Sequence, residues 1–554
     1  MNETIRGLPT RARAAPRRLC RSLCALLVAT SAAACASLPS NAGRTPAAAF
    51  AAPQQTALGR LVQDRRSREG AHSESAFHLL ENVDAAFASR LALIDTAQRS
   101  LDLQYYAIHA DASTEILLQA LRDAARRGVR VRILLDDFNT VGKDAQVLRL
   151  AFEPNVEIRL FNPLTGPRSS LVGRLLTSLQ DFERVQKRMH NKLFIADSAL
   201  GITGGRNLGD AYFGGDGKSS FVDLDVLAAG LIVRDMAASF DRYWNDELAY
   251  PMRALVSPDD LEQLRQAAPG ASAASTGAAV AAAFRPAASS AVLPGILPTV
   301  PPTAAPPPMD LARVRLTWAP ALLLADEPGK IGPGDDEADA GDTVVDGLLH
   351  LMRQARQEIV IVSPYFVPGA AMLELFGQLR AQGVRIRVLT NSLASNDAPA
   401  AHAGYARYRR RLLELGIELH EMRSSQEGAA AGLGSAGGGG SKSGASRASL
   451  HAKAVVIDQR LAVIGSMNLD LRSQRKNSEV ALLIRSRALA VEAARQVEAM
   501  VAQGAYRLVL EAGRLAWQAP AGAGFGSTRS EPDASLRLRA LVRLIAPFAP
   551  DEML

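Results

Sequence analysis

The chain has 554 residues, a length that suggests two or three domains rather than one. Apolar residues make up 48% and charged residues 21%, which excludes a disordered or fibrous protein. The first 34 residues hold six Arg and one Glu, so most of the formal charge of +7 lies there, and the nearly neutral remainder does not require a nucleic-acid partner.

The N-terminus predicts an export signal over residues 1–35. Six arginines precede an apolar run from Leu23 to Ala34, which ends in small residues and is too short to cross a bilayer comfortably. Cys35 stands where a bacterial lipoprotein signal carries the cysteine that receives lipid. We therefore expect an exported, membrane-associated protein on the periplasmic side, anchored through Cys35. A plain cleaved signal and an uncleaved anchor are the alternatives.

The three cysteines all lie in or directly after this signal, at positions 20, 24 and 35. The chain that follows therefore has no disulfide and no thiolate metal site.

The next segment, residues 55–262, predicts an N-terminal lobe. The sequence "LRDAARRGVRVRILLDD" at 121–137 indicates an amphipathic helix, a Gly stop and a buried strand, and "NVEIRLFNP" at 155–163 indicates another strand. Residues 267–308 are rich in Ala, Pro and Ser and predict a flexible or extended linker.

The segment 312–510 predicts a C-terminal lobe that repeats the first. Here "FGQLRAQGVRIRVLTN" at 376–391 and "GIELHEM" at 416–422 follow the same succession of helix, Gly and strands. A Gly/Ser-rich stretch at 424–449 predicts a loop insertion, and residues 511–554 form a C-terminal tail. Strands that alternate with helices indicate an α/β fold: two similar α/β/α lobes with mixed sheets, packed about a pseudo-twofold axis.

A polar frame recurs in both lobes. "HNKLFIAD" (190–197) and "HAKAVVID" (451–458) share His, Lys and Asp at equal spacing, and in a strand the His and Lys side chains lie on the same face. Asn207 and Asn468 each follow the histidine by 17 residues. Asp223 and Glu479 then open another apolar strand. One frame arises easily by chance, whereas two in matching repeats do not.

These residue types suit a phosphate site. Lys and Asn donate hydrogen bonds to phosphate oxygens. A carboxylate that accepts from one imidazole nitrogen fixes the tautomer and leaves the other nitrogen free for chemistry. Together the two sets predict one shared pocket with a histidine on each side.

The chain resembles the phospholipase D superfamily over almost all of residues 75–510. Within it, "RMHNKLFIAD", "GGRNLGDAYF", "TNSLASNDAPAAHAGYARYRRRLLELGIELHE" and "SMNLDLRSQRKNSE" are similar to the bacterial cardiolipin synthase branch, the type without transmembrane helices. The resemblance implies two phospholipase D-like lobes, no metal and no cofactor, and a transfer at phosphorus through a phosphohistidine.

The resemblance also implies residue roles. His190 attacks the phosphodiester and His451 gives and takes the proton, with Asp223 orienting His190 and Glu479 orienting His451. Asp197 and Asp458 complete the catalytic frames, where we expect them to hold backbone groups rather than react. The groups expected to bind the phosphoryl oxygens are Lys192, Lys453, Asn207, Asn468 and Ser466.

The implied product is cardiolipin, made from phosphatidylglycerol and a donor that is either a second phosphatidylglycerol or phosphatidylethanolamine. The alternatives are a phospholipase D that hydrolyses phospholipid, an extracytoplasmic nuclease, and a catalytically silent lipid-binding lipoprotein. His402 is expected beside the acceptor pocket, and the remaining histidines show no ligand-like spacing. The C-terminal "LRLRALVRLIAPF" is expected to be a packing helix, with a position on anionic lipid as the alternative.

Overall fold

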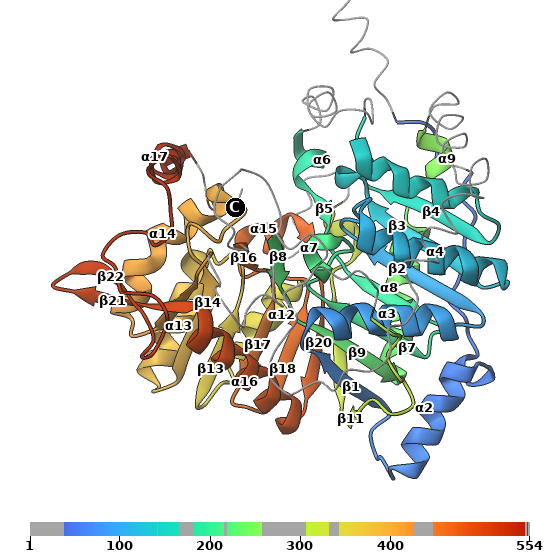
Figure 1. Ribbon diagram of the computed structural model, residues 1–554, viewed down its shortest axis with the longest axis horizontal. Helices are drawn as coiled ribbons and strands as arrows, with labels where there is room; N and C mark the ends of the chain where they lie inside the picture. The colour runs from blue at the N-terminus through green and yellow to red at the C-terminus, as the bar shows by residue number, and fades with distance from the viewer. Residues whose placement is uncertain are drawn as a thin grey trace, which may run out of the picture.

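The computed structural model shows two α/β lobes side by side (Figure 1). It describes residues 38–554 except positions 42, 141, 166–181, 215–218, 257–305, 332–342, 425–446, 549–550 and 552–554. The export signal with Cys35, most of the expected linker at 267–308 and most of the expected insertion at 424–449 lie outside the described residues.

The N-terminal lobe is built on a nine-stranded sheet with the order β10-β4-β3-β2-β6-β7-β9-β1-β11. β2, β3 and β4 pair in parallel and the other neighbours pair antiparallel, so the sheet is mixed. The strands are β1 (Ser75–Leu80), β2 (Ser100–Tyr105), β3 (Arg130–Asp136), β4 (Val156–Phe161), β6 (Leu193–Ala196), β7 (Leu200–Gly204), β9 (Asp225–Gly230), β10 (Ala249–Pro251) and β11 (Thr317–Trp318). The principal helices are α2 (Ala57–Arg68), α3 (Val83–Thr96), α4 (Ala112–Arg126) and α8 (Leu231–Asn245), with the shorter α6 (Phe182–Gln186), α7 (Asp210–Phe213) and α9 (Met252–Leu255).

The C-terminal lobe has its own nine-stranded sheet, which from the corresponding edge reads β22-β21-β15-β14-β13-β17-β18-β20-β12. The strands from β21 to β12 repeat the order from β10 to β1, whereas β22 and β11 are added at opposite edges. β13, β14 and β15 are its parallel strands, in the place of β2, β3 and β4. The strands are β12 (Ala321–Ala325), β13 (Glu358–Val362), β14 (Arg385–Asn391), β15 (Glu418–Met422), β17 (Ala454–Ile457), β18 (Leu461–Gly465), β20 (Val480–Arg485), β21 (Ala505–Glu511) and β22 (Arg514–Gln518). The helices are α12 (Val344–Met352), α13 (Gly369–Ala381), α14 (Pro399–Glu414), α15 (Leu471–Arg475), α16 (Arg487–Gly504) and α17 (Leu536–Ile545).

The unit of helix, Gly and strand that the sequence predicts is present, and its local cause is visible. Asp111 caps α4 by accepting from the amide of Thr114, and the helix buries its face at Leu117, Leu118 and Leu121. Gly128 then turns the chain with φ of 92°, a conformation that favours glycine, into β3. The mixed α/β class and the duplicated lobes are confirmed.

A shared hydrophobic core joins the lobes. One apolar cluster contains side chains of α8 and the inner face of the N-terminal sheet together with side chains of α16 and the inner face of the C-terminal sheet, among them Met236, Trp244, Val360, Leu482 and Val497. Separate clusters fill the outer sides, under α3 and α4 in one lobe and under α12 and α13 in the other. The two sheets are therefore held in a fixed relation around the centre of the molecule.

The lobe boundaries differ from those expected from the sequence. β11 pairs with β1, so residues 317–318 still belong to the N-terminal sheet, and the C-terminal sheet begins at residue 321. β21 continues to residue 511 and pairs with β22, so the first part of the expected tail belongs to the C-terminal sheet. Of the described helices, none is long and apolar enough to span a bilayer.

The first described segment, residues 38–50, is fastened to the N-terminal lobe. The side-chain amide of Asn41 donates to the carbonyl of Glu247 at 2.7 Å, and the amide of Ala49 donates to Asp241 at the same distance. The guanidinium of Arg159 donates to the carbonyl of Thr45 at 2.6 Å. This segment therefore has a defined course along the edge of the lobe.

Candidate active site

Two short strand pairs cross between the lobes and carry the histidines. β5 (Arg188–Met189) of the N-terminal lobe pairs with β19 (Asn477–Ser478) of the C-terminal lobe, and β16 (Arg447–Leu450) pairs with β8 (Ser219–Val222). The backbone amide of His190 donates to the carbonyl of Ser478 at 2.9 Å, and that of His451 donates to Val222 at 2.7 Å. In Figure 1 these strands lie near the middle of the molecule, where the lobes meet.

The crossing places each histidine beside the acid of the other lobe. Nδ1 of His190 lies 3.0 and 3.1 Å from the two carboxylate oxygens of Glu479, and Nδ1 of His451 lies 2.7 Å from Asp223. The sequence-based assignment of Asp223 to His190 and of Glu479 to His451 is therefore wrong. It assumed that each acid serves its own repeat, whereas the strands that set these positions pair across the interface. Each ring keeps Nε2 for chemistry.

Glu479 is held by hydroxyl groups. Ser466 Oγ donates to its carboxylate at 2.5 Å and Ser473 Oγ at 2.7 Å, while the backbone amide of Val480 donates to Ser466 Oγ at 3.0 Å. We expected Ser466 to bind phosphate, but its hydroxyl is engaged by the carboxylate and it positions Glu479 instead.

Asp223, the counterpart of Glu479 in the N-terminal lobe, is more tightly surrounded. Its second oxygen accepts from the amide of Leu224 at 2.8 Å. A Cβ on Gly205 would meet the Asp223 carboxylate at 2.1 Å, so only glycine leaves room for that carboxylate. Gly205 stands two residues before Asn207, as Ser466 stands two before Asn468. At this position the N-terminal lobe has a glycine that leaves room for the carboxylate, whereas the C-terminal lobe has a serine that donates to it.

The two lysines lie against the histidines. Lys192 Nζ donates to the carbonyl of His190 at 2.8 Å and Lys453 Nζ to that of His451 at 2.5 Å, and both side chains are buried. The Lys192 ammonium also lies 5.8 Å from the centre of the Tyr106 ring. Each ammonium therefore accompanies its own lobe's histidine in the shared site.

The two asparagines are buried but differ in their contacts. Asn207 accepts from the amide of Ala107 at 3.2 Å and donates to the hydroxyl of Tyr212 at 2.8 Å. The side-chain oxygen of Asn468 has no hydrogen-bond partner within the described part of the chain. Because the two ends of an amide are exchangeable by rotation, Asn468 is suited to turn its NH2 toward a bound anion.

Asp197 and Asp458 hold backbone and take no part in the histidine site. The Asp197 carboxylate accepts from the amides of Gln98, Arg99 and Ser100 at 2.7 to 3.2 Å. Asp458 accepts from three successive amides of residues 356–358 over the same range. Each lies at the end of its strand remote from the lysine, so its inclusion among the catalytic residues is corrected to an anchoring role.

Burial sets the protonation of the site. It lowers the pKa of both histidines, and the ammonium groups of Lys192 and Lys453 lower it further, to about 4 for His451 and well below 6.5 for His190. Burial also lowers the pKa of Lys192 to about 7 and that of Lys453 to about 8. The resting histidines are therefore neutral at pH 7, with Nε2 unprotonated when Nδ1 donates.

The two carboxylates differ. Burial opposes ionisation of Asp223, but the His451 ring and the Lys453 ammonium hold its pKa at about 2. Burial raises the pKa of Glu479 to about 7, against the lowering influence of Lys192 and the two serine hydroxyls. Asp223 is thus a firm anion under His451, whereas Glu479 titrates near neutrality under His190.

Aromatic rings surround the histidines, a feature that the sequence analysis did not identify. Tyr106 lies edge-on to His190 with ring centres 5.2 Å apart, Tyr212 lies edge-on to His451 at 5.4 Å, and Phe221 is 4.7 Å from His451. Ser473 was also missed. It stands 261 residues after Tyr212, the same offset that separates the two histidines, so aligning the repeats through to this residue would have drawn attention to both.

His402 lies in a separate buried group rather than beside the histidines. Its Nε2 is 3.0 Å from the Arg409 guanidinium, which also pairs with Glu421 and Glu531. Burial and Arg409 lower the pKa of His402 to about 4. This group joins α14, β15 and the C-terminal tail, so the expected place of His402 at the acceptor pocket is replaced by a structural one.

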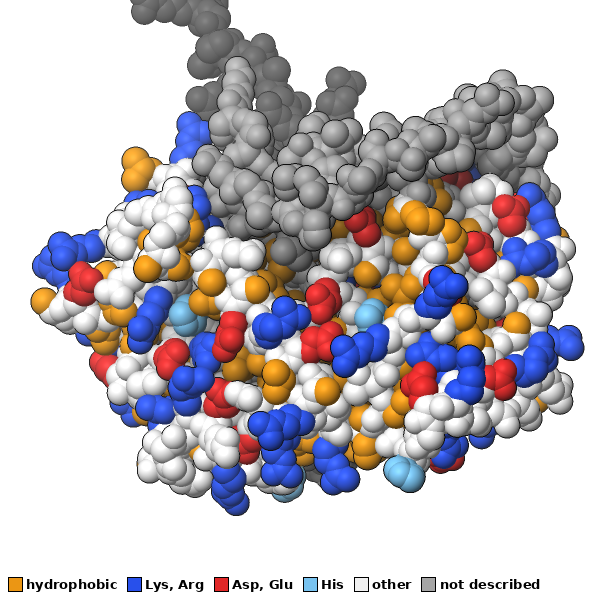
Figure 2. Space-filling model, turned by 60° about the horizontal axis from the view of Figure 1, so that its bottom comes forward, with side chains coloured by type: hydrophobic (Ala, Val, Ile, Leu, Met, Phe, Trp, Pro, Cys, Tyr) orange, Lys and Arg blue, Asp and Glu red, His pale blue; other side chains and the backbone are white. Residues whose placement is uncertain are grey.

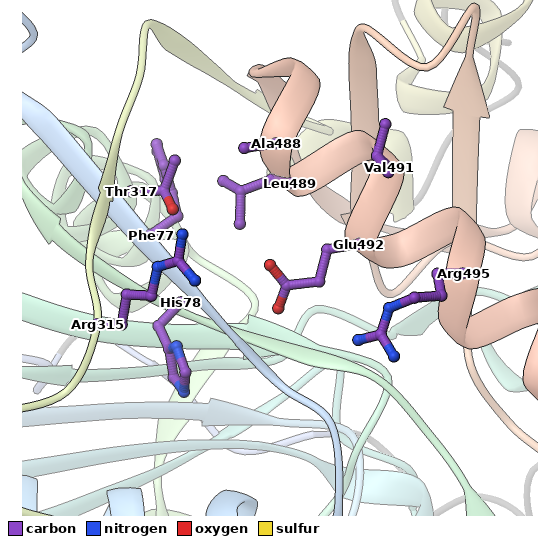
Figure 3. Close-up of a pocket in the computed structure, with 9 residues that line it drawn as sticks. All are labelled: Phe77, His78, Arg315, Thr317, Ala488, Leu489, Val491, Glu492 and Arg495. Atoms are coloured by element: carbon purple, nitrogen blue, oxygen red, sulfur yellow. The ribbon is translucent and has the colours of Figure 1, made fainter.

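A hollow of about 380 Å³ lies elsewhere on the lobe interface (Figure 3). It opens between α16 and the β1 and β11 strands, with Arg315, Glu492 and Arg495 pointing into it from both lobes. None of the histidine-site residues lines it. In the part of the chain that the structure describes, no cluster of three His, Cys, Asp or Glu side chains is arranged to hold a metal ion.

Comparison with known proteins gives consistent results. A family model for the phospholipase D-like domain of cardiolipin synthase matches residues 91–244 and again 348–501. The chain is 37% identical to cardiolipin synthase C of Escherichia coli K12, covering 86% of this chain and 95% of that protein. It is 24% identical to cardiolipin synthase B of the same organism, covering 76% and 78%. The crystal structure of phosphatidylserine synthase from Haemophilus influenzae shares the fold, with a TM-score of 0.54 at 13% identity over 89% of this chain and 99% of that one.

Proposed function

Because this chain belongs to the family of cardiolipin synthases with phospholipase D-like domains and is a phosphatidyltransferase, we propose that it makes cardiolipin by passing a phosphatidyl group through a phosphohistidine. The observation that carries this mechanism is the crossed pair of histidines, each with Nδ1 on a carboxylate and with a buried lysine beside it. Phosphatidylglycerol is the proposed acceptor, and phosphatidylglycerol or phosphatidylethanolamine the donor.

His190 is the proposed nucleophile. Its strongly lowered pKa keeps the ring neutral, and a Glu479 carboxylate on Nδ1 favours the tautomer whose Nε2 lone pair can attack. In the first step a bond forms from Nε2 to phosphorus, and the bond from phosphorus to the departing alcohol oxygen breaks. The displaced alcohol takes a proton from His451.

His451 is the proposed acid and then base. Its Nδ1 faces Asp223, which stays ionised and stabilises positive charge on the ring. A bound phosphodiester anion raises the pKa of the histidine further, so the ring takes up a proton on Nε2 when substrate binds and gives this proton to the departing alcohol in the first step. In the second step the acceptor hydroxyl gives its proton to His451 and attacks phosphorus. The bond to His190 then breaks and the new phosphodiester leaves.

Lys192, Lys453 and the amide of Asn468 are the proposed donors to the non-bridging oxygens. The two ammonium groups are already buried beside the histidines, so they need little rearrangement to meet charge that develops on phosphorus. Asn207 supports the wall of the pocket through Tyr212.

The location remains part of the proposal. An exported protein on the periplasmic side, anchored through Cys35, fits a substrate that is itself a membrane lipid. The fastened segment supports this, because Asn41 and Ala49 are bonded to the N-terminal lobe and Cys35 precedes them by only a few residues in the sequence.

Product analysis tests the proposed reaction. Purified full-length protein is incubated with labelled phosphatidylglycerol, with and without phosphatidylethanolamine, and the lipids are separated. Cardiolipin in either mixture supports the proposal, and the mixture that yields it identifies the donor. Phosphatidic acid alone supports a hydrolase, and no turnover supports a silent lipid-binding protein.

A further inference from the structure

The C-terminal helix α17 has an apolar outer face with no partner in the described structure. Leu536, Leu544 and Leu541 of this helix are 80%, 68% and 46% exposed. Six large hydrophobic side chains are exposed among the described residues, and this ten-residue helix carries three of them. Scattered exposed leucines are ordinary, but three on one short helix form a concentrated apolar surface.

The opposite face of α17 explains why the helix has a fixed position. Val542 is buried and Leu538 and Ile545 are partly buried against α14 and the loop that follows β14, where they contact Leu393 and Ala394. Ser535 caps the helix by accepting from the amide of Leu538. The helix therefore packs on the lobe with one face only. The expected packing helix accounts for that face and leaves the outer face unexplained.

The charge of α17 is of one sign. The helix carries Arg537, Arg539 and Arg543 and no acidic residue. Arg537 and Arg543 are exposed, while Arg539 donates to the carbonyl of Glu531 at 2.7 Å. By contrast, the lower side of the molecule, turned forward in Figure 2, mixes basic and acidic side chains throughout. An apolar face flanked by arginines is complementary to a layer of anionic phospholipid.

The position of α17 matches such a layer. In Figure 1 the helix stands at the upper edge of the C-terminal lobe, and the first described segment passes α9 at the upper edge of the N-terminal lobe. The crossing strands β5, β8 and β16 lie between them in the upper half of the molecule. The helix, the start of the described chain and the strands that precede the histidines therefore lie toward the same side of the molecule.

We propose that the outer face of α17 docks on an anionic phospholipid bilayer, with Leu536, Leu541 and Leu544 in the apolar boundary and Arg537 and Arg543 on lipid phosphates. This inference rests on the proposed function, since it supplies the surface from which the phospholipid reaches the site. The helix packs on the loop that also carries Asp397, whose carboxylate accepts from Tyr365 at 2.8 Å. Burial lowers the pKa of Lys453, and the charge of Asp397 is among those that oppose this lowering. Docking thus occurs one loop away from the catalytic lysine.

A fluorescent label on the helix tests docking directly. In the full-length chain with Cys20, Cys24 and Cys35 changed to Ser, Leu544→Cys carries an environment-sensitive dye, and Leu322→Cys, a site 54% exposed on β12, is the matched control. With phosphatidylglycerol vesicles, the dye at 544 is expected to brighten several-fold and to become shielded from aqueous iodide, while the dye at 322 stays unchanged. Vesicles of phosphatidylcholine should give a much smaller response at 544, and added salt should weaken it.

Three results would overturn the proposal. The dye at 544 remains in water on phosphatidylglycerol vesicles; both dyes respond equally; or the dye at 544 responds to protein concentration without vesicles, which would assign the face to a second copy of the chain. The label reports docking whether or not the enzyme turns over, so a failed product assay leaves this test intact.

A second measurement links docking to turnover. The variant Leu536→Ser/Leu541→Ser/Leu544→Ser should lose several-fold activity on phosphatidylglycerol vesicles and keep wild-type activity on detergent-dispersed substrate, because exposed leucines contribute little to the core. Leu322→Ser is the control. Equal loss in both assays would point to damaged folding rather than docking, which thermal unfolding of each variant would identify.

Discussion

The two lobes share a strand order but hold their parts of the site with different buried groups. In the N-terminal lobe Asp225 pairs with Arg90 at 2.8 Å and with Arg206 at 3.5 Å, all fully buried. In the C-terminal lobe the paired strand position is Ala481, which shares an apolar cluster with Met467 and Leu348. The same backbone geometry is thus compatible with a buried ion network and with ordinary apolar packing.

A second difference repeats this theme nearer the histidines. Asp136 accepts from the amide of Met189 at 2.9 Å and pairs with Arg188, whereas Asn391 accepts from the amide of Leu450 at 2.8 Å and donates to its carbonyl. Both side chains fix the strand that precedes a histidine. The N-terminal lobe does so with charged side chains and the C-terminal lobe with a neutral amide. Equivalent positions in the two lobes therefore need not carry groups that titrate alike.

The largest expected difference is between the histidines. His190→Ala should abolish covalent phosphoryl labelling, because the attacking nitrogen is gone. His451→Ala should still label with a substrate that has a good leaving group, while its turnover of natural lipid falls by roughly 10²- to 10⁴-fold, the usual contribution of a general acid. Acid-labile protein-bound phosphate after rapid quenching measures both variants.

His350→Ala, on the exposed side of α12, is the control and should label like the wild type. Labelling retained by His190→Ala and lost by His451→Ala would reverse the assigned roles.

The next effect concerns stability. Asp225→Ala leaves Arg90 and Arg206 buried without their partner and should lower the free energy of unfolding by about 3–5 kcal/mol. Replacing the group together, Arg90→Leu/Arg206→Met/Asp225→Ala, imitates the C-terminal lobe and should recover most of that loss, since apolar substitutes for a buried ion network are often neutral or stabilising. Denaturant unfolding monitored by circular dichroism compares them.

If the triple variant is as unstable as Asp225→Ala, apolar packing cannot replace the network. The lost hydrogen bond from Arg206 to the carbonyl of Asp223, 2.7 Å long, would then be the first explanation to test.

The smallest expected effect is a change of pH dependence that separates the two acids. The folded pKa of Glu479, about 7, lies above its ordinary 4.5, so this group's contribution to stability is complete below pH 4.5 and is lost as pH rises toward 7. Glu479→Gln removes this titration. The free energy of unfolding of the variant minus that of the wild type should therefore increase with pH across this window, by about 1.4 kcal/mol per pH unit at most.

Asp223→Asn is the matched comparison. The folded pKa of Asp223, about 2, lies below its ordinary 3.8, so its contribution is present above pH 3.8 and is lost only as pH falls toward 2. Its stability difference from wild type should therefore be flat between pH 4.5 and 7. Parallel curves for both variants would contradict the different protonation of the two acids. Urea unfolding at several pH values measures the slopes.

Local spacing allowed the histidines, lysines and asparagines to be predicted, because each repeat carries them in an uninterrupted frame. The α/β class and the duplication followed from helix and strand periods that recur in both halves. The partners of the histidines were not accessible in this way: Glu479 meets His190 only because β19 pairs with β5, and nothing within either repeat records a pairing between repeats. Ser466 was misassigned for the same reason, since its role depends on where Glu479 points.

The crossed strands have a consequence for how such a chain can be divided. Each lobe by itself would contain an imidazole lacking the carboxylate that orients it, so an isolated half is inert however well it folds. Two separately expressed halves should regain chemistry only on association, and a defective acid in one half should be rescued by supplying an intact copy of that same half, as in genetic complementation. The reacting groups are therefore assembled at the interface between the lobes, and a functional enzyme requires both halves of the chain.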